Sequence, residues 1–159
     1  MPQPGPEYTP HESTRYLNER SNQIDVVRWL RWRRVLFLGT LNGEVGLGAD
    51  PYKAIGQAKS VGLEKGAPDL LILEPRGGYH GLAIELKHPR GGVMDDAQRL
   101  WLRALRERGY LAVCECGSVA AVAVIKKYLD GQLTRGGGAA DDDSSSDVEP
   151  PRKAGRLWH

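Results

Sequence analysis

The sequence predicts an α/β fold in which a mixed, four-stranded sheet is flanked by helices. Four short apolar segments have the patterns of strands, and the segments around them repeat apolar residues with helical spacing. One helical segment stands between the third and fourth strands, so we expect it to cross the sheet and join two parallel neighbours. Helices packed in layers on a sheet bury the apolar faces of both kinds of element.

Local signals set the expected ends of these elements. Asp95 or Asp96 is expected to cap the helix between the last two strands, and Gly109 to end it. Ser118 is expected to cap the final helix, and Ile24 to lie on the apolar side of the first one. The expected elements are a helix at about 16–32, a strand at 35–40, a short helix at 52–61, strands at 70–73 and 81–87, a helix at about 95–108, a strand at 111–116 and a helix at 119–129.

The length and composition indicate one domain with tails. The chain has 159 residues, 40% of them apolar, which is enough for one core. We expect a flexible arm at 1–13, the domain at 14–130, and a disordered tail rich in Gly, Ser and Asp at 131–159. The chain carries no membrane-length apolar run and no signal-peptide pattern at its start, so a cytoplasmic protein with no membrane partner is expected.

A basic and aromatic stretch in the first helix has two interpretations. A net charge of only +2 does not by itself indicate a nucleic-acid partner. The stretch could follow a phosphate backbone, or it could be a solvated helix face with its tryptophans packed inward. Its members are Arg28, Trp29, Arg31, Trp32, Arg33 and Arg34.

The two cysteines are interpreted as ordinary reduced thiols. Cys114 and Cys116 lie two residues apart in a strand-like segment, which is a poor arrangement for a disulfide. A zinc site would need two further ligands at suitable spacing, and the sequence offers none.

Charged residues inside two of the apolar strands are the most informative feature. Asp69 begins the second strand, where an unpaired buried carboxylate would be costly. Glu85 and Lys87 lie in the third strand and, by its two-residue alternation, point to the same face. If the two strands are neighbours, Asp69 and Glu85 converge at one edge of the sheet.

This grouping predicts metal-assisted hydrolysis. Two converging carboxylates repel each other unless a cation lies between them, and oxygen ligands favour Mg²⁺ over zinc. The ammonium of Lys87 could orient or deprotonate water, or stabilise a phosphate under attack. A bound divalent ion would activate water and neutralise phosphate charge, so the set suits phosphodiester hydrolysis. The alternative is that Glu85 and Lys87 are a solvent-facing strand pair and Asp69 is a turn residue.

The same segments resemble a known superfamily. The segments GAPDLLIL, IELK, DDAQRLWLRAL with Gln98, and GYLAVCECGS resemble the PD-(D/E)XK nucleases, and Glu19-x-x-x-Gln23 upstream strengthens the match. Within that superfamily the chain is most similar to the VRR-NUC (virus-type replication-repair nuclease) branch, in particular its small stand-alone viral and phage members. The resemblance covers roughly 19–129 and implies a restriction-endonuclease-like core. Ala67 departs from it, because a branched apolar residue is usual there.

The resemblance implies a Mg²⁺ or Mn²⁺ site and no small-molecule cofactor. The implied metal ligands are two strand carboxylates, one backbone carbonyl and a carboxylate on the first helix, namely Asp69, Glu85, Leu86 and Glu19. The implied catalytic residues are these three acids together with Lys87 and Gln98. Residues expected to contact nucleic acid are Gln23, Lys65, His88 and Arg90, and the alternative for the last three is a plain surface role.

The function that follows is a metal-dependent DNA endonuclease. The resemblance implies a homodimer that acts on branched DNA, such as four-way (Holliday) junctions, in DNA repair or recombination within a bacterial or phage-infected cell. A non-catalytic DNA-binding protein on the same fold is the main alternative. A nuclease selective for flaps or other structures, and a sequence-specific restriction-type enzyme, are two more.

Overall fold

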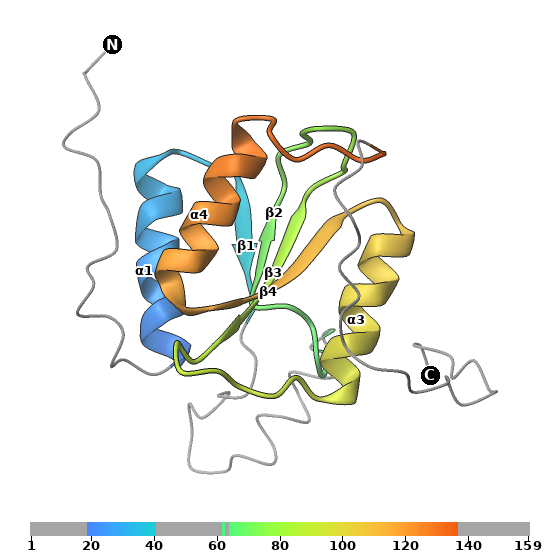
Figure 1. Ribbon diagram of the computed structural model, residues 1–159. Coiled ribbons are helices and arrows are strands. Elements are labelled where there is room, and N and C mark those ends of the chain that lie inside the picture. Colours follow the sequence, from blue (N-terminus) through green and yellow to red (C-terminus); the bar gives the residue numbers. More distant parts are fainter. Residues whose placement is uncertain (1–18, 41–61, 63, 137–159) are drawn as a thin grey trace.

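The architecture is a four-stranded sheet covered by helices on both faces (Figure 1). The structure is a computed structural model of the chain, and it describes residues 19–40, 62 and 64–136. The arm at 1–13, the expected helix at 52–61 and the tail beyond 136 lie outside the described residues. Within the described ranges, none of the helices combines the length and apolar character that a bilayer crossing requires.

The sheet is mixed, as the sequence predicted. Its strands lie in the order β1-β2-β3-β4. The first two pairs of neighbours are antiparallel and the last pair is parallel. The parallel pair is joined by a crossing helix, which confirms the expected connection. The strands are β1 (Phe37–Gly39), β2 (Leu70–Ile72), β3 (Leu82–Lys87) and β4 (Leu111–Cys116).

The helices divide between the two faces of the sheet (Figure 1). α1 (Glu19–Trp32) and α4 (Gly117–Leu129) pack side by side against one face. α3 (Asp96–Glu107) covers the other face. β3 is buried along its whole length because helices cover both of its faces.

The predicted alternation of β3 is confirmed by the two cores. Leu82, Ile84 and Leu86 belong to the core beneath α1 and α4, whereas Ala83 belongs to the core beneath α3. The side chains of Glu85 and Lys87 therefore point toward the α3 side. The apolar face of the strand anchors it, and two of the three residues on the other face, Glu85 and Lys87, are charged.

α1 is rotated differently from the expectation. Ile24 is 44% exposed, so its assignment to the apolar side was wrong. Val26, Trp29 and Leu30 are fully buried instead, because the large Trp29 and Leu30 side chains fill the space between α1, α4 and the sheet.

The burial of Trp29 also shows which way the tryptophans of the basic stretch face. Trp32 packs against the same core, and the four arginines between positions 28 and 34 are exposed. The Arg33 guanidinium lies 5.6 Å from the centre of the Trp29 ring. Both tryptophans thus pack toward the core, as the second interpretation expects, and the fully buried Trp29 cannot stack with bases.

The predicted ends of α3 are confirmed, but the predicted cap of α4 is wrong. Asp95 caps α3, and Gly109 follows its C-cap with a φ of 84°. α4 begins at Gly117, so Ser118 lies inside its first turn. The backbone N–H of Ser118 donates instead to Oδ1 of Asn22, at 3.0 Å, and Asn22 is fully buried on α1. A side chain of α1 therefore accepts from an N–H in the first turn of α4, where the backbone supplies no intrahelical acceptor.

The end of α4 leads back to the sheet. Tyr128 is fully buried, and its hydroxyl donates to the carbonyl oxygen of Glu74 at 2.6 Å. Further along, the N–H of Arg135 donates to the carbonyl oxygen of Gly77 at 2.7 Å. The described residues after α4 thus contact the turn between β2 and β3.

The contact between Asn22 and Ser118 yields a stability prediction. Replacing Asn22 with Ala removes the side-chain oxygen that accepts the hydrogen bond of the buried Ser118 N–H. We expect the free energy of unfolding to fall by about 1–3 kcal/mol in urea titrations. Arg31→Ala, an exposed change on the same helix, should shift it by less than about 0.5 kcal/mol. An Asn22→Ala variant as stable as Arg31→Ala would show that this contact contributes nothing.

Candidate active site

A buried ion pair lies at the C-terminal end of β3. The Lys87 ammonium is 2.8 Å from Oε1 of Glu85, and the two side chains are only 7% and 2% exposed. Both residues project from the face of β3 that α3 covers. Since each charge is removed from water, each depends on the other and on further polar partners. The interpretation of Glu85 and Lys87 as a solvent-facing strand pair is therefore wrong.

Asp69 lies directly across from Glu85. In the antiparallel pairing of β2 with β3, Leu70 is the partner of Ile84. Continuing this register by one residue places Asp69 opposite Glu85. Oδ2 of Asp69 accepts a hydrogen bond of 2.7 Å from the N–H of Leu86. Two carboxylates thus meet at one edge of the sheet, as expected if the two strands are neighbours.

The backbone of Asp69 is held from two other elements. Its carbonyl oxygen accepts from the N–H of Thr40, just after β1, at 2.9 Å, and from Nε2 of Gln23, on α1, at 3.1 Å. The Thr40 hydroxyl also donates to the carbonyl oxygen of Pro68 at 2.6 Å. These contacts fix the turn that delivers the Asp69 side chain to the site.

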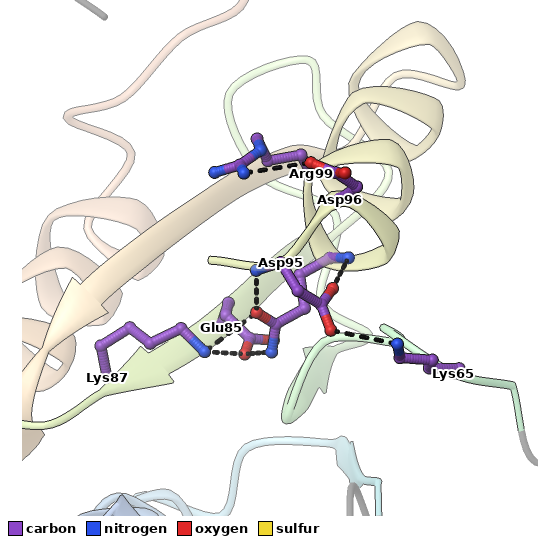
Figure 2. A network of polar contacts seen from close by, with 7 residues as sticks. Lys65, Glu85, Lys87, Asp95, Asp96 and Arg99 are labelled. Atoms are coloured by element: carbon purple, nitrogen blue, oxygen red, sulfur yellow. Dashed lines mark hydrogen bonds and ion pairs between the residues drawn. The ribbon is translucent and has the colours of Figure 1, made fainter. Parts of the chain in front are cut away.

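Gln98 joins α3 to the buried pair. Its Nε2 donates to Oε1 of Glu85, and its Oε1 accepts from Nζ of Lys87 at 3.0 Å. Figure 2 shows this network between the end of β3 and the first turn of α3. One amide therefore supplies both the donor and the acceptor that the buried pair requires.

The first turn of α3 is fixed by a capping box. Asp95 Oδ1 accepts from the N–H of Gln98 at 2.8 Å, and Gln98 Oε1 accepts from the N–H of Asp95 at 3.0 Å. The hydrogen bond from the Gln98 N–H also lowers the pKa of the Asp95 carboxyl below its usual value. Lys65 lies nearby, with Nζ 3.6 Å from Asp95 Oδ2.

Comparisons with known proteins identify the family of this domain. The model of the VRR-NUC domain family matches residues 17–119, which is more than half of the chain. The chain belongs to the VRR-NUC family. A solved structure described as a VRR_NUC domain protein is 28% identical, with a TM-score of 0.55, over 72% of this chain and 90% of that one. No curated protein matches the chain.

Membership of the VRR-NUC family confirms the predicted fold. The chain carries a nuclease-type domain with a mixed four-stranded sheet and helices on both faces. The family match spans every site residue named so far, from Gln23 to Gln98.

The oxygen atoms at this VRR-NUC site fit a hard divalent cation. Asp69 and Glu85 supply carboxylate oxygens, and the hydrogen bonds that hold these two acids come from backbone, amide and ammonium nitrogens. The described residues contain no group of three His, Cys, Asp or Glu that could form an all-protein metal site. Mg²⁺ commonly uses one or two carboxylates and completes its shell with water and substrate phosphates. The donor set therefore suits Mg²⁺ or Mn²⁺ better than zinc.

The remaining site predictions fall at different places in the VRR-NUC domain. Gln23, expected to contact nucleic acid, is partly buried and holds the Asp69 carbonyl. His88 follows β3, and its Nδ1 accepts from the N–H of Arg90 at 3.1 Å; the Arg90 side chain is exposed. Lys65 is exposed beside Asp95. Glu19 begins α1, and its side chain lies outside the described part of the structure.

Sequence reasoning did not assign any role at the site to Asp95 beyond capping the helix. The signal was present, because Asp95 and Gln98 have the spacing of a capping box. What the spacing could not show is that the Gln98 side chain would also meet β3, since that contact depends on how α3 packs across the sheet.

Cys114 lies beside the ion pair and yields a test of its charge. β4 pairs Cys114 with Glu85. Burial and, secondly, the negative charge of Glu85 raise the pKa of the Cys114 thiol to about 11. Cys116, at the end of β4, is exposed.

We therefore expect slow alkylation of Cys114. At pH 8 its thiol is almost entirely protonated, and only the thiolate reacts. Iodoacetamide should label the exposed Cys116 first, and peptide mass spectrometry can follow both sites. In Glu85→Gln the Cys114 pKa should fall and its labelling should accelerate. Equal rates at Cys114 in the two proteins would contradict this electrostatic coupling.

Proposed function

We propose that this chain is a metal-dependent endonuclease that hydrolyses phosphodiester bonds in DNA. The observation that carries the proposal is the buried Glu85–Lys87 pair placed across from Asp69 and held by Gln98. Membership of the VRR-NUC family supports a nuclease, and the local geometry supports the assignment of roles to individual side chains.

Asp69 and Glu85 would hold a Mg²⁺ or Mn²⁺ ion, with the Leu86 carbonyl as a third ligand. The N–H of Leu86 donates toward Asp69. In an extended strand the N–H and C=O of one residue point to the same side, so the Leu86 carbonyl faces the edge that carries Asp69. When bound, the ion would activate water and neutralise phosphate charge. Glu19, on α1, remains a further candidate ligand.

Lys87 would act on the scissile phosphate. Its ammonium is held by two acceptors, Glu85 and Gln98, so its position is fixed before substrate arrives. A positioned cation stabilises negative charge that develops on phosphate oxygens, and it can orient the attacking water. Gln98 would keep the ammonium in place rather than react itself. Lys65, His88 and Arg90 would contact the DNA around the site.

The proposed substrate is branched DNA, such as a four-way junction, and the proposed active form is a homodimer. Every element in the described part of the chain belongs to the sheet or to the helices that cover it. Such a core offers no added module for reading base sequence, which favours recognition of DNA shape. A two-fold dimer would present two equal sites to a symmetric junction.

The catalytic assignment predicts the behaviour of two variants. Glu85→Gln and Lys87→Ala should each lower Mg²⁺-dependent cleavage at least about 100-fold, because each removes a group that acts on the transition state. Matched controls are Glu107→Gln and Lys127→Ala, which change exposed side chains on α3 and α4. Labelled linear, flap, splayed and four-way DNAs should be tested with Mg²⁺ or Mn²⁺, and circular dichroism should confirm folding.

The same panel separates the competing functions. A non-catalytic DNA-binding protein would bind with equal affinity in all variants and cut nothing, which would refute the nuclease proposal. Cleavage of flaps alone would refute the junction assignment and leave the nuclease. Cleavage at one sequence in linear duplexes would indicate a restriction-type enzyme. The oligomeric state follows from light scattering of the full chain.

A further inference from the structure

We propose that Asp95 is a positioning residue for the active site, acting through Gln98 on Lys87 and Glu85. The inference rests on the proposed function for its catalytic consequence, but its structural basis stands on separate contacts. The capping box of α3 and the polar network of the active site share the Gln98 side chain. The capping box, which in most helices only stabilises the N-terminal end, therefore also sets the positions of Lys87 and Glu85.

The carbonyl oxygen of the Gln98 side chain serves two purposes. Its Oε1 accepts from the backbone N–H of Asp95 and from the Lys87 ammonium, both at 3.0 Å. An amide oxygen has two lone pairs, so these two donors use its full capacity. Rotating the amide by half a turn would place its NH₂ group against two other donors, the Asp95 N–H and the Lys87 ammonium, and both hydrogen bonds would be lost. The capping box thus fixes which end of the amide faces Lys87.

The Asp95 carboxylate holds the backbone that carries this side chain. Its Oδ1 accepts from the Gln98 N–H at 2.8 Å, which satisfies one of the N–H groups left free at the start of a helix. Without the carboxylate the first turn of α3 would fray more easily. Because Gln98 lies in that turn, its amide would no longer be confined to one position against Glu85 and Lys87.

A close packing contact ties the same turn to the segment that leads to Asp69. A Cβ atom added to Gly66 would lie 2.5 Å from the carbonyl carbon of Ala97 and 2.7 Å from the backbone nitrogen of Gln98. Gly66 also has a φ of 84°, which favours glycine. Lys65, the exposed residue before Gly66, approaches Asp95, and Figure 2 shows this ion pair. The Asp69 segment and the Gln98 turn therefore hold each other in place.

The inference predicts a graded series of activities. Asp95→Ala removes the cap and should lower kcat about 10–100-fold with little change in KM, because the catalytic groups lose their alignment while the DNA contacts remain. Asp95→Asn and Asp95→Ser retain a capping oxygen and should stay within about threefold of wild type. Ala104→Gly, in the middle of α3, is the control that weakens the helix without touching its first turn.

Two measurements test the proposal. The first is kcat and KM on whichever DNA of the panel is cut best. The second measurement does not depend on activity. It records the NMR signals of the Gln98 side-chain amide in ¹⁵N-labelled full-length protein, and these signals are assigned by their loss in Gln98→Ala. They should shift and broaden in Asp95→Ala, and remain as in wild type in Asp95→Asn and Ala104→Gly.

The outcomes distinguish this inference from the proposed function. If Asp95→Ala cuts as well as Ala104→Gly and leaves the Gln98 signals unchanged, the positioning role is refuted while the nuclease stands. If wild type cuts no DNA but the Gln98 signals respond to Asp95→Ala as expected, the nuclease proposal fails and the structural coupling holds. Failure of Asp95→Asn and Asp95→Ser to rescue Asp95→Ala would also overturn the inference.

Discussion

The burial of two opposite charges on one face of β3 is the constraint from which the rest of the site follows. Glu85 and Lys87 are almost entirely withdrawn from water, and their mutual contact of 2.8 Å does not satisfy all of their hydrogen-bonding groups. A buried ion pair is stable only when further polar partners complete it. The fold provides such a partner in Gln98, which reaches the pair from α3, the helix that covers this face of β3.

That requirement explains the placement of α3. A helix that crosses between parallel neighbours β3 and β4 begins near the end of β3, where Lys87 lies. Its first turn then faces the buried carboxylate, and the positive end of the helix dipole favours the negative charge of Glu85. The same turn needs a cap, which Asp95 supplies, and close contact with the next segment, which Gly66 permits. The crossing connection, the Asp95 cap and the close approach at Gly66 thus all help to place Gln98 against the buried pair.

Sequence patterns predicted those features that depend on short stretches of chain. The alternation of β3, the cap at Asp95 and the end of α3 at Gly109 were each visible within a few residues. The cap of α4 was not, because the acceptor for the Ser118 N–H is Asn22, on a different helix and 96 positions away. The orientation of α1 failed for a similar reason: the choice between Ile24 and Trp29 as the buried side chain depends on the space that α4 leaves beside the sheet.

The charged pair itself is hard to explain by stability alone. Apolar side chains of similar size often serve a core as well as a buried ion pair does, or better. The neighbouring positions of β3 show that this site could hold them, since Ala83 and the three residues of the opposite face are apolar and buried. A sheet that buries a glutamate and a lysine beside Asp69 keeps groups suited to cation and phosphate chemistry. The additional contacts from Gln98 and its capping box stabilise groups that packing would not require, so the architecture of this end of the sheet is best understood as support for the chemistry that we propose for these groups.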